Sequence, residues 1–248
     1  MHSLCRILAL AITFAALLPQ LSAQNSRNSE LPPQGKSMMP DSVAAAPSEA
    51  KPARFPQLTM EQLTEPQKAL AREMLQVSSA GLGGPYNIQL RSPEMTVARF
   101  RLMSYLRFHT TVPRPLNEFA ILIQARLSTA QYEWWAHYPL ALKAGLTQTV
   151  ADQLKEGKRP SPMSPEQAAV YQFCVELSLN HRVSDPTFDA LRKIFNDQQI
   201  VDLIAISGEY VSTSMLLNVA EVGIPNGGAP PMKPLTDAKL RKGLLTAK

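Results

Sequence analysis

The sequence predicts an all-α protein whose body is a single domain of about seven helices. At several positions a polar capping residue is followed by proline, as in the first turn of a helix, and apolar residues then recur every three or four positions. No segment shows the alternation of apolar and polar residues that is typical of a strand. With 45% hydrophobic residues among 248, the chain can form one sizeable core.

Residues 1–23 have the pattern of a signal peptide for export. Arg6 precedes an uncharged run of twelve residues, 7–18, which is too short to span a bilayer but has the length of a secretory apolar region. A small-residue exit then ends at Ala23. We therefore expect a periplasmic or secreted protein with no stable membrane association after cleavage. A retained membrane anchor is the alternative.

Residues 24–56 are predicted to be a disordered linker. They are rich in Ser, Pro, Ala and Gln and hold almost no large apolar residues, so little burial can offset the entropy cost of ordering them. The predicted helical domain follows at residues 57–225. Its seven helices are expected at about 64–77, 92–108, 115–127, 130–144, 164–180, 184–195 and 197–223.

Local signals mark the ends of these helices. Proline stands in the first turn of the first three, and Gly145 ends the fourth. Ser164 and Gln167 form a capping box at the start of the fifth, and Ser184 or Asp185 begins the sixth. The last helix is apolar on more than one face, which indicates burial in the core or in a subunit interface.

The formal net charge of +5 does not indicate nucleic-acid binding, because the excess lies near the ends of the chain. Residues 226–248 hold five basic residues and one acidic residue, and Arg6 lies in the predicted signal peptide, so residues 24–225 are neutral. A phosphate-binding surface needs basic residues clustered on the folded body. We therefore interpret 226–248 as a basic flexible tail and expect no nucleic-acid partner.

The densest functional pattern lies in residues 116–145. Glu133 and His137 are four residues apart on a predicted helix, so their side chains share one face. A carboxylate can orient an imidazole and raise its pKa, which suits acid–base catalysis, although such pairs are also common on solvated faces. Aromatic residues at 132, 134, 135 and 138 favour a site here. Glu118 lies in an apolar stretch, where an acid needs a partner or a purpose.

Several short stretches resemble the carboxymuconolactone decarboxylase family, which also contains the alkylhydroperoxidase D type of protein. The resemblance spans roughly residues 58–223. It rests on Gly84-Pro85-Tyr86-Asn87, Leu90-Arg91-Ser92-Pro93-Glu94, Tyr105-Leu106-Arg107, Glu118 with the apolar turn after it, Ala125-Arg126, Glu133-Trp134-Trp135-Ala136-His137 and Ala141-Leu142-Lys143-Ala144-Gly145-Leu146. It implies the alkylhydroperoxidase D-like helical fold.

The family's peroxidase branch uses a Glu, a Cys-x-x-Cys pair and a His. By resemblance the Glu matches Glu118 and the His matches His137, but the two cysteines fall on Ala130 and Glu133. A thiol peroxidase cycle needs one sulfur to attack the peroxide and a second to resolve the product. Cys174, the one cysteine left after signal removal, lies in an apolar helical pattern typical of a core residue. Thiol peroxidase activity is therefore not expected.

The decarboxylase branch carries a Glu-Trp-x-x-His form, which Glu133, Trp134 and His137 match. This resemblance implies a cofactor-independent and metal-free lyase that decarboxylates a small acidic lactone, as a homotrimer or homohexamer. His137 would be the general acid, Glu133 would orient it, and Glu118 would relay protons. A family member that binds a small acid without turnover, or one that isomerises or hydrates a lactone, is the alternative.

An anionic substrate needs a cation in its pocket, and three arginines are candidates. Arginine can hold a carboxylate with two parallel hydrogen bonds. The candidate substrate-binding residues are Arg126, Arg107, Arg91, Trp134, Tyr86 and Asn87. No spacing typical of metal ligands is present.

Overall fold

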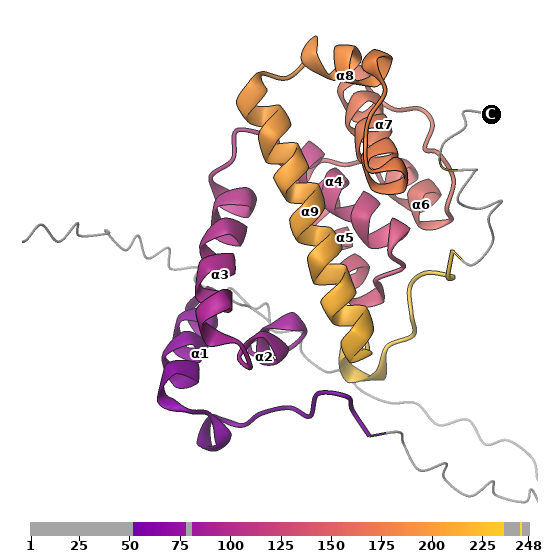
Figure 1. Cartoon of the computed structure of the whole chain (residues 1–248). Coiled ribbons are helices and arrows are strands. Elements are labelled where there is room, and N and C mark those ends of the chain that lie inside the picture. Colours follow the sequence, from indigo (N-terminus) through magenta and orange to yellow (C-terminus); the bar gives the residue numbers. More distant parts are fainter. Residues whose placement is uncertain (1–51, 78–80, 236–243, 245–248) are drawn as a thin grey trace, which may run out of the picture. The chain divides into compact units, whose positions relative to one another are not determined.

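The computed structural model describes residues 52–77, 81–235 and 244, all of which belong to one compact unit, residues 50–248. The predicted signal peptide, and the predicted linker before residue 52, lie outside the described residues. The described part contains nine α-helices and no strand, so the predicted all-α fold is confirmed. Figure 1 shows the helices in sequence colours.

The helix bounds follow the expected order with two additions. The helices are α1 (Glu65–Val77), α2 (Pro85–Gln89), α3 (Pro93–Phe108), α4 (Arg114–Leu127), α5 (Gln131–Ala144), α6 (Gln148–Lys155), α7 (Pro165–Asn180), α8 (Asp185–Arg192) and α9 (Asp197–Ala220), with 3-10 turns at Met60–Gln62 and Pro225–Gly227. The expectation of seven helices missed α2 and α6. The predicted capping box of Ser164 and Gln167 is present at the start of α7.

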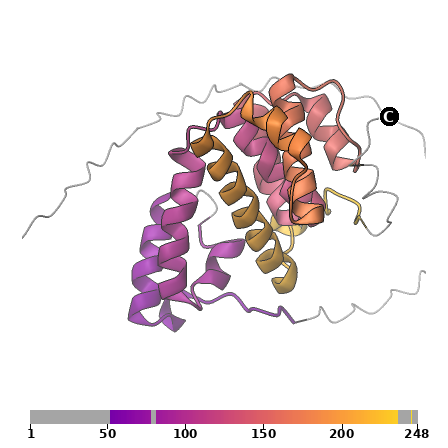
Figure 2. The same cartoon turned by 45° about the horizontal axis from the view of Figure 1, so that its top comes forward.

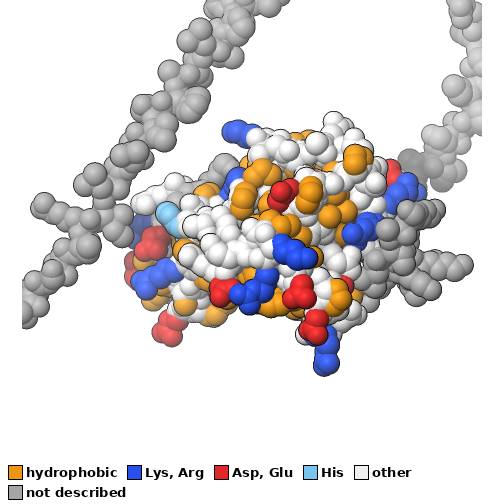
Figure 3. Space-filling model, turned by 90° about the horizontal axis from the view of Figure 1, so that it is seen from above, with side chains coloured by type: hydrophobic (Ala, Val, Ile, Leu, Met, Phe, Trp, Pro, Cys, Tyr) orange, Lys and Arg blue, Asp and Glu red, His pale blue; other side chains and the backbone are white. Residues whose placement is uncertain are grey.

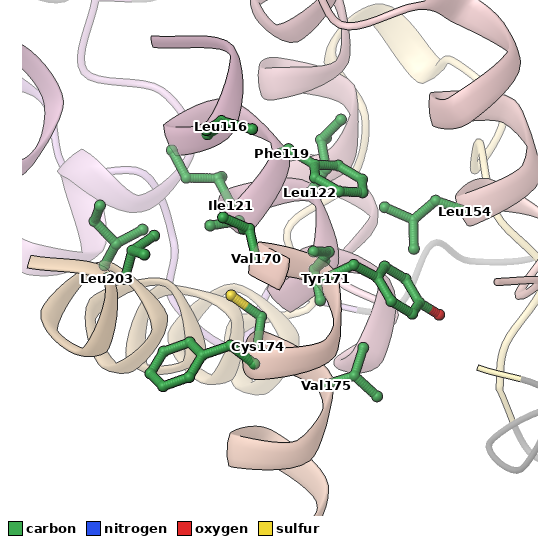
Figure 4. Close-up of a cluster of buried hydrophobic side chains, with 14 of the residues drawn as sticks. Leu116, Phe119, Ile121, Leu122, Leu154, Val170, Tyr171, Cys174, Val175 and Leu203 are labelled. Carbon is green, nitrogen blue, oxygen red and sulfur yellow. The ribbon is translucent and has the colours of Figure 1, made fainter. Parts of the chain in front are cut away.

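Helix α4 is the centre of the main core. Every residue from Leu116 to Arg126 is buried, because α5, α7 and α9 all pack against it. The largest hydrophobic cluster surrounds this helix and includes Phe119, Tyr171 and Leu203, drawn in Figure 4. A helix surrounded in this way has no solvated face, so the polar side chains on it need partners within the protein.

Helices α1 to α3 form a second group on the other side of α9. Figures 1 and 2 both show α9 between this group and the group that contains α4, α6, α7 and α8. A separate small hydrophobic cluster, which includes Leu70, Met74 and Leu90, holds α1, α2 and the turn before α1 together. Helices α2 and α3 also contact α9, which brings the loop before α2 close to the main core.

Helix α9 is buried on one side only. Among the described residues it is the one helix long and apolar enough to cross a membrane, but 56% of its most apolar stretch is buried within the protein. Packing against α4 therefore accounts for much of its apolar character. Val201, Ile204, Met215 and Val219 are exposed on it.

The chain after α9 returns to the core, which differs from the expected flexible tail in its described part. The Met232 side chain is buried, and Gln131 binds its backbone at both N and O, at 2.9 and 2.8 Å. Leu244 is buried, and its carbonyl accepts a 2.6 Å hydrogen bond from Tyr171. Local composition did not reveal these contacts because they join residues about 70 to 100 positions apart.

Charged side chains are mixed on the face shown in Figure 3. Basic and acidic groups alternate there with hydrophobic side chains, and neither sign forms a continuous patch on that face. This distribution resembles an ordinary solvated surface.

Candidate active site

The hairpin of α4 and α5 brings the candidate acid–base residues together. Helix α4 ends at Leu127, and the short connection contains Thr129 with a φ of 49°, which reverses the chain. Helix α5 then runs back along α4 until Gly145, in the left-handed region with a φ of 108°, ends it. Glu118 of α4 consequently lies against His137 of α5, nineteen positions later.

His137 contacts a carboxylate at each of its two ring nitrogens. Nδ1 lies 2.7 Å from Oε2 of Glu118, and Nε2 lies 3.2 Å from Oε1 of Glu133. The second oxygen of Glu118 lies 2.6 Å from Nη2 of Arg114, which is half-exposed. Glu118 itself is fully buried, so the imidazole and the guanidinium together compensate its charge. The three predicted residues thus form one cluster.

The cluster holds His137 in its charged form. Burial alone lowers the pKa of His137, but the hydrogen bonds to Glu118 and Glu133 outweigh this effect and raise the pKa to about 9. Burial alone raises the pKa of Glu118, but the hydrogen bond to His137 and the charges of His137, Arg114 and Arg107 lower it overall. At neutral pH the pair is therefore an imidazolium and a carboxylate.

A cavity of about 510 Å³ opens beside His137. Its size is in the range of small-molecule sites. Four aromatic rings and one arginine contribute to its wall. The lining residues are Pro85, Tyr86, Met103, Arg107, Tyr132, Glu133, Trp135, Ala136, His137, Pro139, Leu140, Tyr210 and Thr213. Glu133 and His137 face the cavity. Glu118 is absent from this wall and contacts His137 at Nδ1, away from the cavity.

Two of the six predicted substrate-binding residues line the cavity. Tyr86 and Arg107 face each other there, because the Tyr86 hydroxyl and the Arg107 guanidinium form a hydrogen bond. Burial, the largest cause, raises the pKa of Tyr86 despite the nearby arginine. The Arg107 guanidinium also lies over the Phe108 ring, 4.9 Å from its centre. These contacts hold Arg107 at the cavity wall.

The structure places the other two arginines elsewhere. Arg126 is buried among residues of the C-terminal segment and donates a 2.9 Å hydrogen bond to the carbonyl of Lys233. Arg91 donates to the carbonyl of Pro56 at 2.5 Å and lies over the Phe55 ring. Both arginines fasten chain segments that come from distant parts of the sequence, and neither lines the cavity.

Asn87 and Trp134 also make structural contacts and do not line the cavity. The Asn87 amide pairs with both backbone groups of Leu58, with each bond 2.9 Å long, and so ties α2 to the segment before α1. Trp134 is buried in the main core and packs on Tyr138, with the ring centres 5.9 Å apart. Its neighbour Trp135 lines the cavity instead.

Solved structures share this arrangement of helices. The alkylhydroperoxidase AhpD core of an uncharacterized peroxidase-related protein from Ralstonia eutropha JMP134 has a TM-score of 0.57 and 18% sequence identity, covering 80% of this chain and 100% of that chain. The chain has the alkylhydroperoxidase AhpD fold. An uncharacterized peroxidase-related protein from Silicibacter sp. TM1040 has a TM-score of 0.56 and 16% identity, covering 71% of this chain and 95% of that chain.

Similarity at this level establishes the AhpD fold and leaves the reaction to be argued from the site. No protein-family model matches the chain, and no curated protein matches its sequence significantly. Ala130, at the position of the first expected cysteine in AhpD-type peroxidases, is buried at the start of α5. Glu133, at the second such position, faces the cavity.

Three residues of this AhpD-fold site were not predicted from the sequence. Tyr210 of α9 lines the cavity, and its ring meets the His137 ring edge-on, with centres 5.1 Å apart and planes at 84°. Arg114 contacts Glu118 one helical turn away. Gly84 leaves room for the Tyr132 ring, because a β-carbon there would lie 2.4 Å from Cζ of Tyr132. Only the Arg114 contact had a local signal, its four-residue spacing from Glu118.

Within the described residues, no group of three or more His, Cys, Asp or Glu side chains is arranged to hold a metal ion. The acidic and imidazole groups of the cluster instead contact one another and Arg114.

Proposed function

We propose that the protein is an acid–base enzyme that decarboxylates a small, unsaturated carboxylic acid of the lactone type without a cofactor. The observation that carries this proposal is the placement of His137. Nδ1 binds the buried Glu118, and Nε2 lies at the cavity wall beside Glu133. A charged imidazole fixed at one nitrogen, with the other toward a ligand cavity, is suited to donate a proton.

The reaction follows from the charges at this site. The carbon–carbon bond to the substrate carboxylate breaks, carbon dioxide leaves, and the electron pair passes into a conjugated carbonyl to give a dienolate. Nε2 of His137 then gives its proton to carbon and forms the new C–H bond, and the imidazole regains a proton from water. Glu118 stays ionised throughout and stabilises the imidazolium, which assigns to it the orienting role expected for Glu133.

Glu133 has a different role in this proposal. Its carboxylate shares the cavity wall with Nε2 and lies at the longer of the two contacts, 3.2 Å. The substrate carbon must therefore reach Nε2 beside this carboxylate. We infer that Glu133 holds the proton-donating edge of the ring toward the cavity and passes on to it the proton that water supplies after each turnover.

The cavity wall supports the substrate class. Tyr86, Tyr132, Trp135 and Tyr210 provide flat apolar surface for an unsaturated ring, and Arg107 is the one arginine on the wall. An anionic ligand of this size would find one guanidinium there, in addition to the His137 imidazolium that donates the proton. We therefore assign attraction of the substrate to Arg107, in preference to Arg126 and Arg91.

The thiol chemistry of AhpD-type peroxidases is not supported by this chain. Cys174 is the one cysteine among the described residues, and it is buried in the core drawn in Figure 4. Burial raises the pKa of its thiol to about 12. The thiolate that attacks a peroxide is therefore scarce and inaccessible at neutral pH.

The proposal is tested by incubating the protein with 4-carboxymuconolactone and measuring carbon dioxide release. We expect release by the wild type, and a fall in kcat/KM of about 100-fold or more for His137→Gln, which removes the proton donor. His109→Gln is the matched control, because His109 is exposed at the end of α3, away from the cavity wall, and should leave the rate unchanged. Binding without conversion, or conversion without carbon dioxide, would contradict the proposal.

A further inference from the structure

Two buried hydrogen-bond donors at the cavity have no partner among the described residues. One is the hydroxyl of Tyr210, whose side chain is 2% exposed, and the other is Nε of Arg107. Both residues line the cavity beside His137. Buried polar groups in folded proteins are nearly always hydrogen-bonded, and leaving one unpaired is costly. Two such donors at one cavity indicate that a bound ligand supplies the acceptor.

The surroundings of both donors are fixed. Tyr210 belongs to the long helix α9, and its ring packs edge-on against the ring of His137. Arg107 is held by its hydrogen bond with Tyr86 and by stacking on Phe108. Donors held in place before the ligand arrives need little reorganisation during a reaction, which is the condition for strong stabilisation of a developing charge.

We propose that Tyr210 and Arg107 form an oxyanion-binding pair that holds the negatively charged carbonyl oxygen of the substrate while His137 protonates carbon. This inference rests on the proposed function. It narrows the substrate class to acids in which the carbon that loses carbon dioxide is conjugated to a carbonyl oxygen, because only then does the charge move to an oxygen that the pair can bind.

The chemistry of the two donors fits this role. Burial raises the pKa of Tyr210 well above its ordinary value, so the phenol keeps its proton and donates a hydrogen bond. The charge of Arg107 acts on the Tyr210 phenol and opposes the rise of its pKa, so Arg107 adds a positive charge in the same part of the cavity. The negative charge of the substrate carboxylate is conserved when carbon dioxide leaves and reappears on the dienolate oxygen. The pair therefore binds this oxygen most strongly after the carbon–carbon bond breaks.

The test uses 4-nitrophenol, whose phenolate oxygen imitates the dienolate and whose ionisation is visible by absorbance. We expect the wild type to bind the phenolate more tightly than the neutral phenol. Tyr210→Phe should weaken phenolate binding about 10- to 100-fold, as expected for a lost hydrogen bond to a charged group. Tyr105→Phe is the matched control, because the Tyr105 hydroxyl contacts Asp202 outside the cavity.

Nitrobenzene keeps the nitro group and the ring but lacks the phenolate oxygen, so it separates the effect of the hydrogen bond from the effect of cavity shape. We expect Tyr210→Phe to leave nitrobenzene binding unchanged. Equal weakening of nitrobenzene and the phenolate would overturn the proposal, since a change of cavity shape would then explain both. Unchanged phenolate binding in Tyr210→Phe would also overturn it.

A stability measurement without ligand gives a second, independent check. Since the Tyr210 hydroxyl has no described partner, Tyr210→Phe should unfold at the wild-type temperature or above. Tyr171→Phe, which loses its bond to Leu244, should unfold at a lower temperature. A clear loss of stability in Tyr210→Phe would overturn the proposal by indicating an internal partner.

These outcomes also separate this inference from the proposed function. If Tyr210→Phe weakens phenolate binding while 4-carboxymuconolactone releases no carbon dioxide, the oxyanion-binding pair is supported and the decarboxylase function fails. If His137→Gln abolishes carbon dioxide release while Tyr210→Phe changes neither turnover nor phenolate binding, the decarboxylase function stands and the oxyanion-binding pair is overturned.

Discussion

The charge of His137 links the chemistry of the site to the stability of the protein. Its pKa of about 9 in the folded protein exceeds the ordinary value of 6.5, so folding is coupled to proton uptake between these values. The stability gained is fully present below pH 6.5 and is lost as the pH rises through about 9. The stability contributed by Glu118 changes with pH in the opposite direction. Its pKa is lowered in the folded protein, so this contribution is present at neutral pH and is lost in acid.

We therefore expect the free energy of unfolding to fall by a few kcal/mol more in the wild type than in His137→Gln as the pH rises from about 6 to about 10. Urea denaturation at a series of pH values measures this difference. The His109→Gln control should follow the wild type, because His109 is exposed. The same pH dependence in His137→Gln and in the wild type would contradict the stabilising role of the charged imidazole.

The absence of the Cys-x-x-Cys pair predicts that the protein does not reduce peroxides. The protein should not reduce hydroperoxides at the expense of dithiols, because Ala130 and Glu133 stand where AhpD-type peroxidases are expected to carry cysteine. Cys174 is buried, and its Sγ lies 3.6 Å from the Ser207 hydroxyl in the core. A coupled dithiol-oxidation assay measures the rate. Peroxide turnover that disappears in Cys174→Ala would contradict our interpretation of this site.

At the scale of helices, local capping signals predicted the long elements well. The Ser164 capping box marks the start of α7 as expected. Helix α2 was missed because it has only five residues, begins at Pro85 directly after Gly84 and resembles a loop. Helix α6 was missed because Gly145 ends α5 just before it, although Val150, Ala151 and Leu154 have helical spacing and are buried.

Local spacing predicted the contacts of the site only where the residues share a helix. Glu133 and His137 follow from their four-residue spacing, and Glu118 from the resemblance and from the cost of a buried acid. The choice of Arg107 over Arg126 depends on tertiary packing, which turns one side chain to the cavity and the other to the C-terminal segment. Tyr210 lies 73 positions after His137, so no local pattern connects them.

The loop before α2 shapes the cavity through one glycine. Gly84 has a φ of 58°, which disfavours any side chain, and a β-carbon there would collide with the Tyr132 ring. We expect Gly84→Ala to lower the free energy of unfolding by about 1–3 kcal/mol and to weaken 4-nitrophenol binding, because Tyr132 must leave the cavity wall. Chemical denaturation and absorbance titration measure these effects.

Gly223→Ala is the control for this substitution. Gly223 follows α9, has no positive φ, and a β-carbon there would meet nothing within 4 Å. It should change neither stability nor binding appreciably. Wild-type stability and binding in Gly84→Ala would show that the contact between Gly84 and Tyr132 does not shape the cavity.

For the whole molecule, the exposed side of α9 favours self-association. Val201, Ile204, Gly208, Val211 and Met215 recur at spacings of three and four residues on one side of this helix, and Met215 is 62% exposed. A continuous apolar stripe of this kind is typical of an interface. The expected homotrimer or homohexamer stays a prediction, as do export and cleavage after Ala23.

Light scattering at micromolar concentration tests the oligomer. We expect an assembly larger than a monomer, and we expect Met215→Lys to shift it toward the monomer because a charge would be buried in the apolar stripe. Leu75→Lys is the matched control, since Leu75 is equally apolar and 47% exposed but lies on α1. A stable wild-type monomer, or an unchanged assembly in Met215→Lys, would contradict the prediction.

The central claim is that His137, held by Glu118 and Glu133, is an imidazolium that faces a ligand cavity. An NMR titration of the His137 ring in the full mature protein tests this claim most directly, with Glu118→Gln as the comparison. We predict a pKa of about 9 in the wild type and a lower value in Glu118→Gln, because the buried carboxylate stabilises the charged ring. A wild-type pKa at or below the ordinary value of 6.5 would contradict the account.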